Sequence, residues 1–160
     1  MAGYGTDEAF ATWASDNGYS VPDDLTAAVL RQRGSEYIDG IYGNRFPGTR
    51  TDGYAQERAW PRADAVLCSG ETVPDDVIPD AVIKASYHAA YAEAVTPGSL
   101  STSYTPGTAK VLTKVDKIEW EVVGKAEGAN GGMSVVLTSV EGLLAPFLLP
   151  VGGIPNILVV

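Results

Sequence analysis

The sequence is short of the residues that build catalytic and metal sites. It contains one cysteine and one histidine, so an internal disulfide is excluded and a zinc site would lack its usual ligands. Cys68 is expected to be a small, partly buried hydrophobe. His88 has no cysteine or carboxylate at ligand spacing, and no nucleophile–base motif accompanies it. We therefore expect no catalytic residues, no metal and no cofactor in a protein that is not an enzyme.

Basic residues and long apolar runs are also scarce. Lys and Arg total 11 against 20 Asp and Glu, which gives a formal net charge of −9. This balance disfavours non-specific duplex binding, which depends on neutralising phosphates, but it suits the wall of a conduit along which DNA slides. No stretch reaches the ~18–20 apolar residues of a membrane span, because prolines and glycines interrupt the apolar end 143–160. We expect no secretory signal, no membrane contact and synthesis in the cytoplasm.

Apolar periodicity and capping residues predict a mainly α fold, a small helical bundle with long loops. Thr6 is a suitable N-cap for a first helix that stops at Asn17–Gly18. Asp23 or Asp24 should cap a second helix, which ends near Tyr42–Gly43. Gly34 lies inside this helix at a cost of about 1 kcal/mol relative to alanine, so it should permit a close helix crossing or a kink.

The second half of the chain combines helices with one predicted pair of strands. The alanine-rich segment 80–95 is the clearest helix, and a further apolar run from Ser134 to Leu144 should be helical until Pro146. Residues 110–123 read as β structure whose apolar phase switches near Asp116–Lys117. This switch predicts a β-hairpin or a bulge. The Pro- and Gly-containing end cannot form a regular helix and should be an extended C-terminal arm.

A long loop, residues 43–62, follows the second helix and has no clear period. The segment 31–62 holds six of the eleven basic residues, all of them arginines: Arg31, Arg33, Arg45, Arg50, Arg58 and Arg62. Arginine favours planar bidentate contacts to carboxylate or phosphate, so the loop reads as a recognition surface. The alternative is a structured loop whose arginines pair with Asp39, Asp52 and Glu57.

Several segments resemble a family of tailed-bacteriophage proteins described as DnaT-like single-stranded-DNA-binding proteins. They are RGSEYIDGIYGNRFPGTRTDGYAQERAWPRADA, IPDAVIKASYHAAYAEA, KVDKIEWEV and VEGLLAPFL. The family is structurally similar to head–tail adaptors, also called head-completion or connector proteins. Such adaptors are small helical subunits that form a ring under the portal, which implies a homo-oligomeric ring of twelve copies here. The resemblance covers nearly the whole chain.

The resemblance implies a structural role in the virion neck, assembled in the host cytoplasm. The partners would be the portal protein and a tail or next neck-ring protein, with phage DNA passing through the channel without sequence-specific binding. Residues 1–147 would form the adaptor domain, with the inserted loop 43–62 and hairpin 110–123, and 148–160 the docking arm. The portal-docking residues would be Leu148, Leu149, Val151, Ile154, Ile157, Leu158, Val159 and Val160. The subunit-contact candidates are Arg45, Phe46, Arg50, Trp60 and Arg62.

The alternative function is that of a DnaT-like single-strand binder. It needs cations for phosphates and aromatic faces for bases. The loop offers both, in the set Arg45, Arg50, Arg58 and Arg62 with Phe46, Tyr54 and Trp60. The acidic balance of the remaining chain opposes this function, so the sequence alone favours the adaptor.

Overall fold

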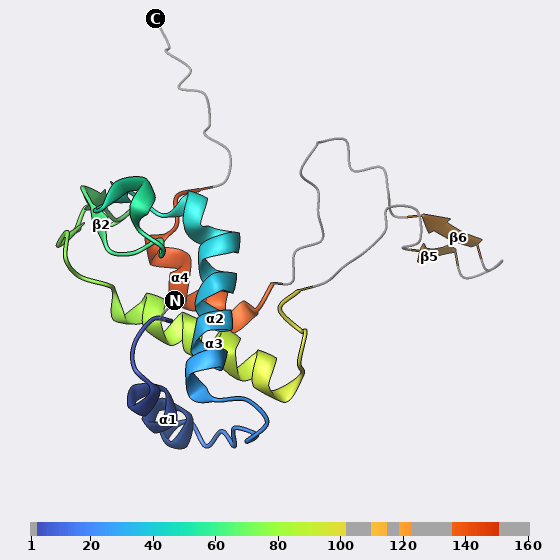
Figure 1. Ribbon diagram of the computed structural model, residues 1–160. Coiled ribbons are helices and arrows are strands. Elements are labelled where there is room, and N and C mark those ends of the chain that lie inside the picture. Colours follow the sequence, from blue (N-terminus) through green and yellow to red (C-terminus); the bar gives the residue numbers. More distant parts are fainter. Residues whose placement is uncertain (1–2, 102–109, 115–118, 123–135, 151–160) are drawn as a thin grey trace, which may run out of the picture. The chain divides into compact units, whose positions relative to one another are not determined.

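The computed structural model describes residues 3–101, 110–114, 119–122 and 136–150 (Figure 1). The chain divides into two compact units, residues 1–100 with 136–160 and residues 101–135. Four α-helices and short antiparallel strand pairs account for the regular structure, so the predicted mainly α class is confirmed. Within the described residues, no helix is long and apolar enough to cross a membrane.

Helix α1 (Asp7–Asp16) forms where the sequence predicts it. The Thr6 hydroxyl accepts a hydrogen bond from the amide of Ala9, and the helix ends at Asn17. Asp7 and Glu8 in the first turn complement the helix dipole. The buried side of the helix carries Phe10, Trp13 and Ala14.

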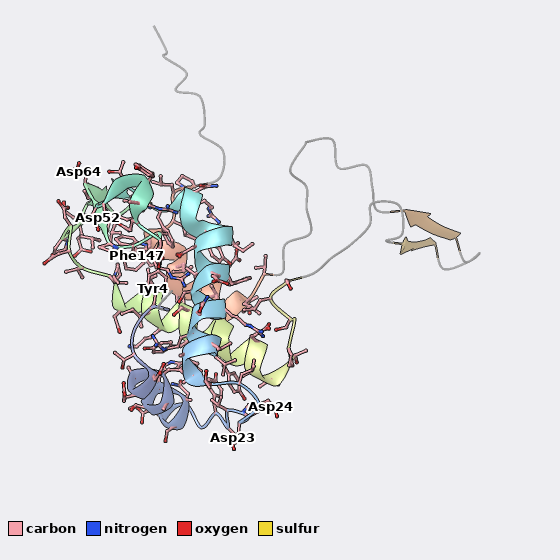
Figure 2. All side chains as sticks on the ribbon, viewed as in Figure 1. Tyr4, Asp23, Asp24, Asp52, Asp64 and Phe147 are labelled. Atoms are coloured by element: carbon pink, nitrogen blue, oxygen red, sulfur yellow. The ribbon has the colours of Figure 1, made fainter. Side chains whose placement is uncertain are left out.

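Helix α2 (Ala27–Tyr42) begins later than predicted, and Asp23 and Asp24 are not its caps. Thr26 has an extended backbone and its hydroxyl accepts from the amide of Val29, so it satisfies the free N–H that a cap must satisfy. Asp23 and Asp24 lie in the preceding turn, exposed to solvent (Figure 2). The helix ends where predicted and continues as a 3-10 turn, η1 (Gly43–Arg45).

Helix α3 (Asp80–Val95) has the predicted bounds and packs against α2 at Gly34. A Cβ atom on Gly34 would lie 2.3 Å from the carbonyl oxygen of Ser86 and 2.7 Å from the amide of Ala90. The two backbones therefore approach too closely for any side chain at this position. The predicted close helix crossing is confirmed.

Helix α4 (Thr138–Leu144) is shorter than the predicted run from Ser134. Residues 134–135 lie outside the described part, and Leu137 is the N-cap. A 3-10 turn, η3 (Ala145–Phe147), accommodates Pro146 near its start. Because Val140 and Leu144 are fully buried, α4 completes the core against α3.

Short strands occur where the sequence predicted only loop and connecting turn. Strand β1 (Thr49–Arg50) pairs with β2 (Arg62–Ala63), and β3 (Ala65–Val66) pairs with β4 (Thr72–Val73). Another 3-10 turn, η2 (Gly53–Ala55), lies between β1 and β2. Pairs of two residues are too short to show a period-2 pattern, which is why the sequence conceals them.

The second unit contains the predicted hairpin. Strands β5 (Lys110–Lys114) and β6 (Glu119–Val122) are antiparallel, and their register shifts between Leu112 and Lys114. The predicted antiparallel pair is therefore confirmed. Its register irregularity lies between Leu112 and Lys114, whereas the predicted phase switch near Asp116–Lys117 lies outside the described residues.

Two buried clusters hold the first unit together. One surrounds Trp60 and joins the loop to α2, α3 and α4. The other places Phe10 and Trp13 of α1 against Leu30 and Tyr87. Cys68 belongs to neither cluster and is exposed, so its predicted partial burial is wrong: its segment is a surface hairpin turn.

Candidate nucleic-acid interface

The loop 43–62 is held in shape by Arg62, whose guanidinium points inward. It donates hydrogen bonds to four backbone carbonyls: Pro47 at 2.6 Å, Gly48 at 2.7 Å, Ala59 at 3.0 Å and Phe46 at 3.3 Å. Only 8% of Arg62 is exposed. Burial, with Arg50 nearby, lowers the pKa of Arg62. Arg62 therefore supplies donors that an irregular backbone cannot supply to itself.

A buried polar group ties the N-terminal segment to the same loop. The Tyr4 hydroxyl donates to Asp39 Oδ1 at 2.5 Å and accepts from the Trp60 amide at 3.2 Å. Arg58 Nη1 lies 3.4 Å from Asp39 Oδ2, with both side chains about one-tenth exposed. Burial is the main cause that raises the pKa values of Tyr4 and Asp39. Of the carboxylates expected to pair within the loop segment, Asp39 does so.

The two arginines on α2 also have partners within the protein, Arg31 as a buried side chain and Arg33 as one that is 45% exposed. Arg31 Nη1 donates to the carbonyls of Gly3, Tyr4 and Gly5, while its Nη2 lies 2.7 Å from Asp7. Arg33 pairs with the buried Glu93 of α3 at 2.9 Å. Arg31, Arg33, Arg58 and Arg62 are thus structural residues. For Arg62, the sequence signal for this role is the glycine and proline content of its loop, because irregular backbone leaves carbonyls in need of donors.

A groove of about 620 Å³ opens beside the loop. Arg50, Asn44, Thr49, Tyr54 and Leu149 contribute to its lining. Tyr54 sits on η2 and is 99% exposed. The exposed Arg50 is oriented by a 3.2 Å hydrogen bond from its Nη1 to the carbonyl of Gln56. The groove therefore presents an open aromatic face beside a cation.

Structure separates the predicted site residues into two groups. Phe46 and Trp60 are 2% and 1% exposed and pack edge to face at a centroid distance of 5.6 Å. Together with Arg62 they form the interior of their own subunit, and a partner could reach them only by opening the core. Arg45 and Arg50 remain accessible, so subunit contact stays a prediction for these two. Tyr54 is the one loop aromatic placed for stacking among the predicted set.

The predicted docking arm begins inside the core. Leu148 is 7% exposed and belongs to the Trp60 cluster. The Leu149 amide donates to the Arg45 carbonyl at 2.7 Å, and Arg45 Nε donates to the Leu149 carbonyl at 3.3 Å. The other arm residues, Val151, Ile154, Ile157, Leu158, Val159 and Val160, lie outside the described residues. Their docking stays a prediction.

His88 and the carboxylates gather no metal site in the part of the chain that the structure describes. The His88 ring packs edge-on against Trp13 at 4.8 Å and against Tyr19 at 6.3 Å. Burial lowers the pKa of His88. Its observed surroundings are those of a packing residue.

Comparison with known proteins identifies a family. A family model described as "Putative DnaT-like ssDNA binding protein" matches residues 3–159. No curated protein and no solved structure matches the chain. The family assignment therefore rests on sequence, and the groove geometry is independent of it.

Proposed function

The chain belongs to the family of putative DnaT-like ssDNA binding proteins, and on this premise we propose that it binds single-stranded DNA through the Tyr54 groove. The family description supports this function over the head–tail adaptor that the sequence alone favoured. Nothing in the comparisons supports the adaptor.

The observation that carries the proposal is the position of Tyr54. An aromatic ring that is 99% exposed has no packing role in its own subunit. Stacking a base on such a ring contributes about 1–3 kcal/mol, whatever the base. Arg50 lines the same groove and can meet the adjoining phosphate.

Binding should be weak and only mildly dependent on salt. Two loop arginines, Arg45 and Arg50, remain available for phosphates, whereas the chain as a whole carries a net charge of −9. Each phosphate neutralised on a single strand contributes about −0.7 to the slope of log K against log salt. We expect a slope of about −1.4, with sequence-independent affinity that is measurable at low salt.

The test is fluorescence anisotropy of a labelled oligothymidine titrated with the full chain at low salt. Tyr54→Ala should weaken binding about tenfold through the lost stacking contact. Tyr54→Phe, which keeps the ring, is the matched control and should bind as the parent does. Absence of binding by the parent, or equal binding by Tyr54→Ala, would overturn the proposal.

The contribution of Arg50 can be tested separately through salt. Arg50→Ala should make the salt slope shallower by about 0.7, because one fewer phosphate is neutralised. Lys84→Ala removes an equal charge from α3, outside the groove residues. The lysine variant should leave the slope unchanged.

A structural adaptor in a phage neck is the second candidate. The observation that favours it is the inward use of Arg31, Arg58 and Arg62, which leaves an acidic protein with few cations for phosphate. In this function the chain forms a ring under a portal, and residues 151–160 of the arm bind that portal. Mass measurement of the chain with and without portal tests it. A chain that neither forms rings nor joins the portal would eliminate the adaptor.

A further inference from the structure

A second groove, of about 560 Å³, lies between α1 and α3. Its apolar lining includes Ala9, Trp13, Ile83 and Tyr87. Trp13 and Tyr87 are nearly buried, whereas Ala9 on the outer side of α1 is exposed. The volume lies within the range of pockets that enclose small ligands or several aliphatic side chains.

Several polar groups that line this groove already have hydrogen-bond or ion-pair partners within the chain. Lys84 Nζ lies 2.7 Å from Asp80 Oδ2, and the Asn17 side-chain amide donates to the Trp13 carbonyl at 2.7 Å. The Tyr87 hydroxyl is directed to the carbonyl of Thr6. A guest with polar groups of its own would have to compete with these bonds. The groove is suited to an uncharged, apolar guest.

The chain itself contains such a guest. No charged side chain occurs after Glu141, and the sequence ends in Ile157, Leu158, Val159 and Val160. Residues 151–160 follow directly on Pro150, which is exposed. These ten residues have enough apolar surface to fill a groove, and none of their side chains is charged.

The groove and the start of this segment lie at opposite ends of α2. Helix α1 packs beside the first turns of α2, where Arg31 meets Asp7 and Phe10 joins Leu30 (Figure 1). Leu149 is bonded to Arg45, beyond the other end. The sixteen residues of α2 span about 24 Å at 1.5 Å per residue. Ten extended residues reach at most about 36 Å. If the segment ran to the groove of its own chain, most of its length would be needed to cover the distance, and few residues would remain to fill the groove.

We propose that the α1–α3 groove binds residues 151–160 of a second copy of this chain. The donor surface and the acceptor surface differ, so the contact is head-to-tail and can repeat from copy to copy. Prolines such as those at 150 and 155 disfavour a helix, and in the proposed complex the segment inserts along the groove in an extended form. This inference is independent of DNA binding.

The experiment measures the mass of the full chain by sedimentation velocity over a range of concentrations, without DNA. The parent should self-associate as concentration rises. Ala9→Glu places a carboxylate in the groove from an exposed position and should remain monomeric. Ala11→Glu introduces the same charge on an exposed residue of the same helix outside the groove lining, and should associate as the parent does.

A mixing experiment identifies the occupant. Leu158→Asp spoils the donor segment and leaves the groove intact, so this variant alone should also be monomeric. Mixed with Ala9→Glu, it should form a heterodimer that grows no further. The intact groove of Leu158→Asp binds the intact segment of Ala9→Glu, and no further pair of intact surfaces remains. A parent that stays monomeric, equal behaviour of Ala9→Glu and Ala11→Glu, or a mixture without heterodimer would each overturn the proposal. The last result would mean that the segment docks within its own chain.

Discussion

The segments that pack at the two ends of α2 are held by different kinds of interaction. At the N-terminal end of α2, α1 packs through the cluster that joins Phe10 and Trp13 to Leu30 and Tyr87, and the Tyr87 ring lies 5.3 Å from Phe10. At the C-terminal end of α2, the loop 43–62 packs through the Trp60 cluster and is also held in shape by hydrogen bonds from Arg62 to its own backbone carbonyls. Both ends pack apolar side chains, but the loop adds a hydrogen-bond network that α1 does not have, so the loop is the polar end and α1 the apolar end.

The difference follows from how each segment satisfies the hydrogen-bonding groups of its backbone. A helix satisfies its own N–H and C=O groups, so α1 needs only an apolar side to pack. An irregular loop buries carbonyls that have no backbone partner, and a single arginine side chain can donate hydrogen bonds to several of them. Arginines in an irregular segment can therefore be internal scaffolding, even where their number indicates a recognition surface.

The largest loss of stability should come from removing the hydrogen bonds that Arg62 makes within the loop 43–62. Arg62→Ala removes four hydrogen bonds and leaves buried carbonyls unpaired. Since hydrogen bonds to charged donors contribute about 1.5–3 kcal/mol each and are not additive, we expect a loss of at least about 3 kcal/mol of unfolding free energy. Urea unfolding followed by circular dichroism measures it.

Arg50→Ala is the matched control for that experiment. Arg50 comes from the same two-stranded pair but is exposed, and it makes one hydrogen bond to Gln56. Its removal should change stability by less than about 0.5 kcal/mol. Comparable losses for the two variants would mean that the inward network does not hold the loop.

The helices were predictable where one local signal dominated. The bounds of α3 follow from its alanine-rich stripe, and those of α1 from Thr6 and Asn17. The start of α2 was not predictable, because Asp23, Asp24 and Thr26 are all capping residues and the choice depends on where α2 packs. The hairpin was found from its change of apolar phase, whereas the two-residue strands β1 and β2 carry no such pattern.

The candidate site was only partly predictable. Sequence identified the loop that lines the groove and included Arg50 and Tyr54 among the predicted single-strand contacts. It could not separate them from Phe46, Trp60 and Arg62, which the structure turns inward. Composition is the same for an arginine that faces solvent and one that faces carbonyls. The direction is decided by backbone positions that have no local signature.

An intermediate loss of stability should come from disturbing the α2–α3 crossing at Gly34, which lies between the two ends of α2. Gly34→Ala would force a methyl group to within 2.3 Å of the Ser86 carbonyl, so α2 and α3 must separate. Overpacking of this kind costs about 1–3 kcal/mol. Gly40→Ala in the same helix meets no atom within 4 Å, and should stabilise by up to about 1 kcal/mol. Thermal unfolding of both variants distinguishes a steric effect from helix propensity.

The smallest effect concerns the apolar end and its single histidine. Burial against Trp13 and Tyr19 lowers the pKa of His88 below its ordinary value of 6.5. The folded state therefore binds this proton less readily than the unfolded chain does. The stability that His88 contributes is complete above the unfolded pKa and is lost as pH falls through the folded pKa.

His88→Gln removes this titration and keeps a polar side chain of similar size. Between pH 8 and pH 5, the parent should lose more unfolding free energy than the variant, with the difference developing below about pH 6.5. Arg62→Lys, which alters the polar end only, should keep the parent's histidine-dependent slope. Parallel curves for parent and His88→Gln would mean that the imidazole is equally solvated in both states. The aromatic contacts of His88 would then fail to exclude water from the imidazole, and the apolar end would contribute no pH-dependent stability of its own.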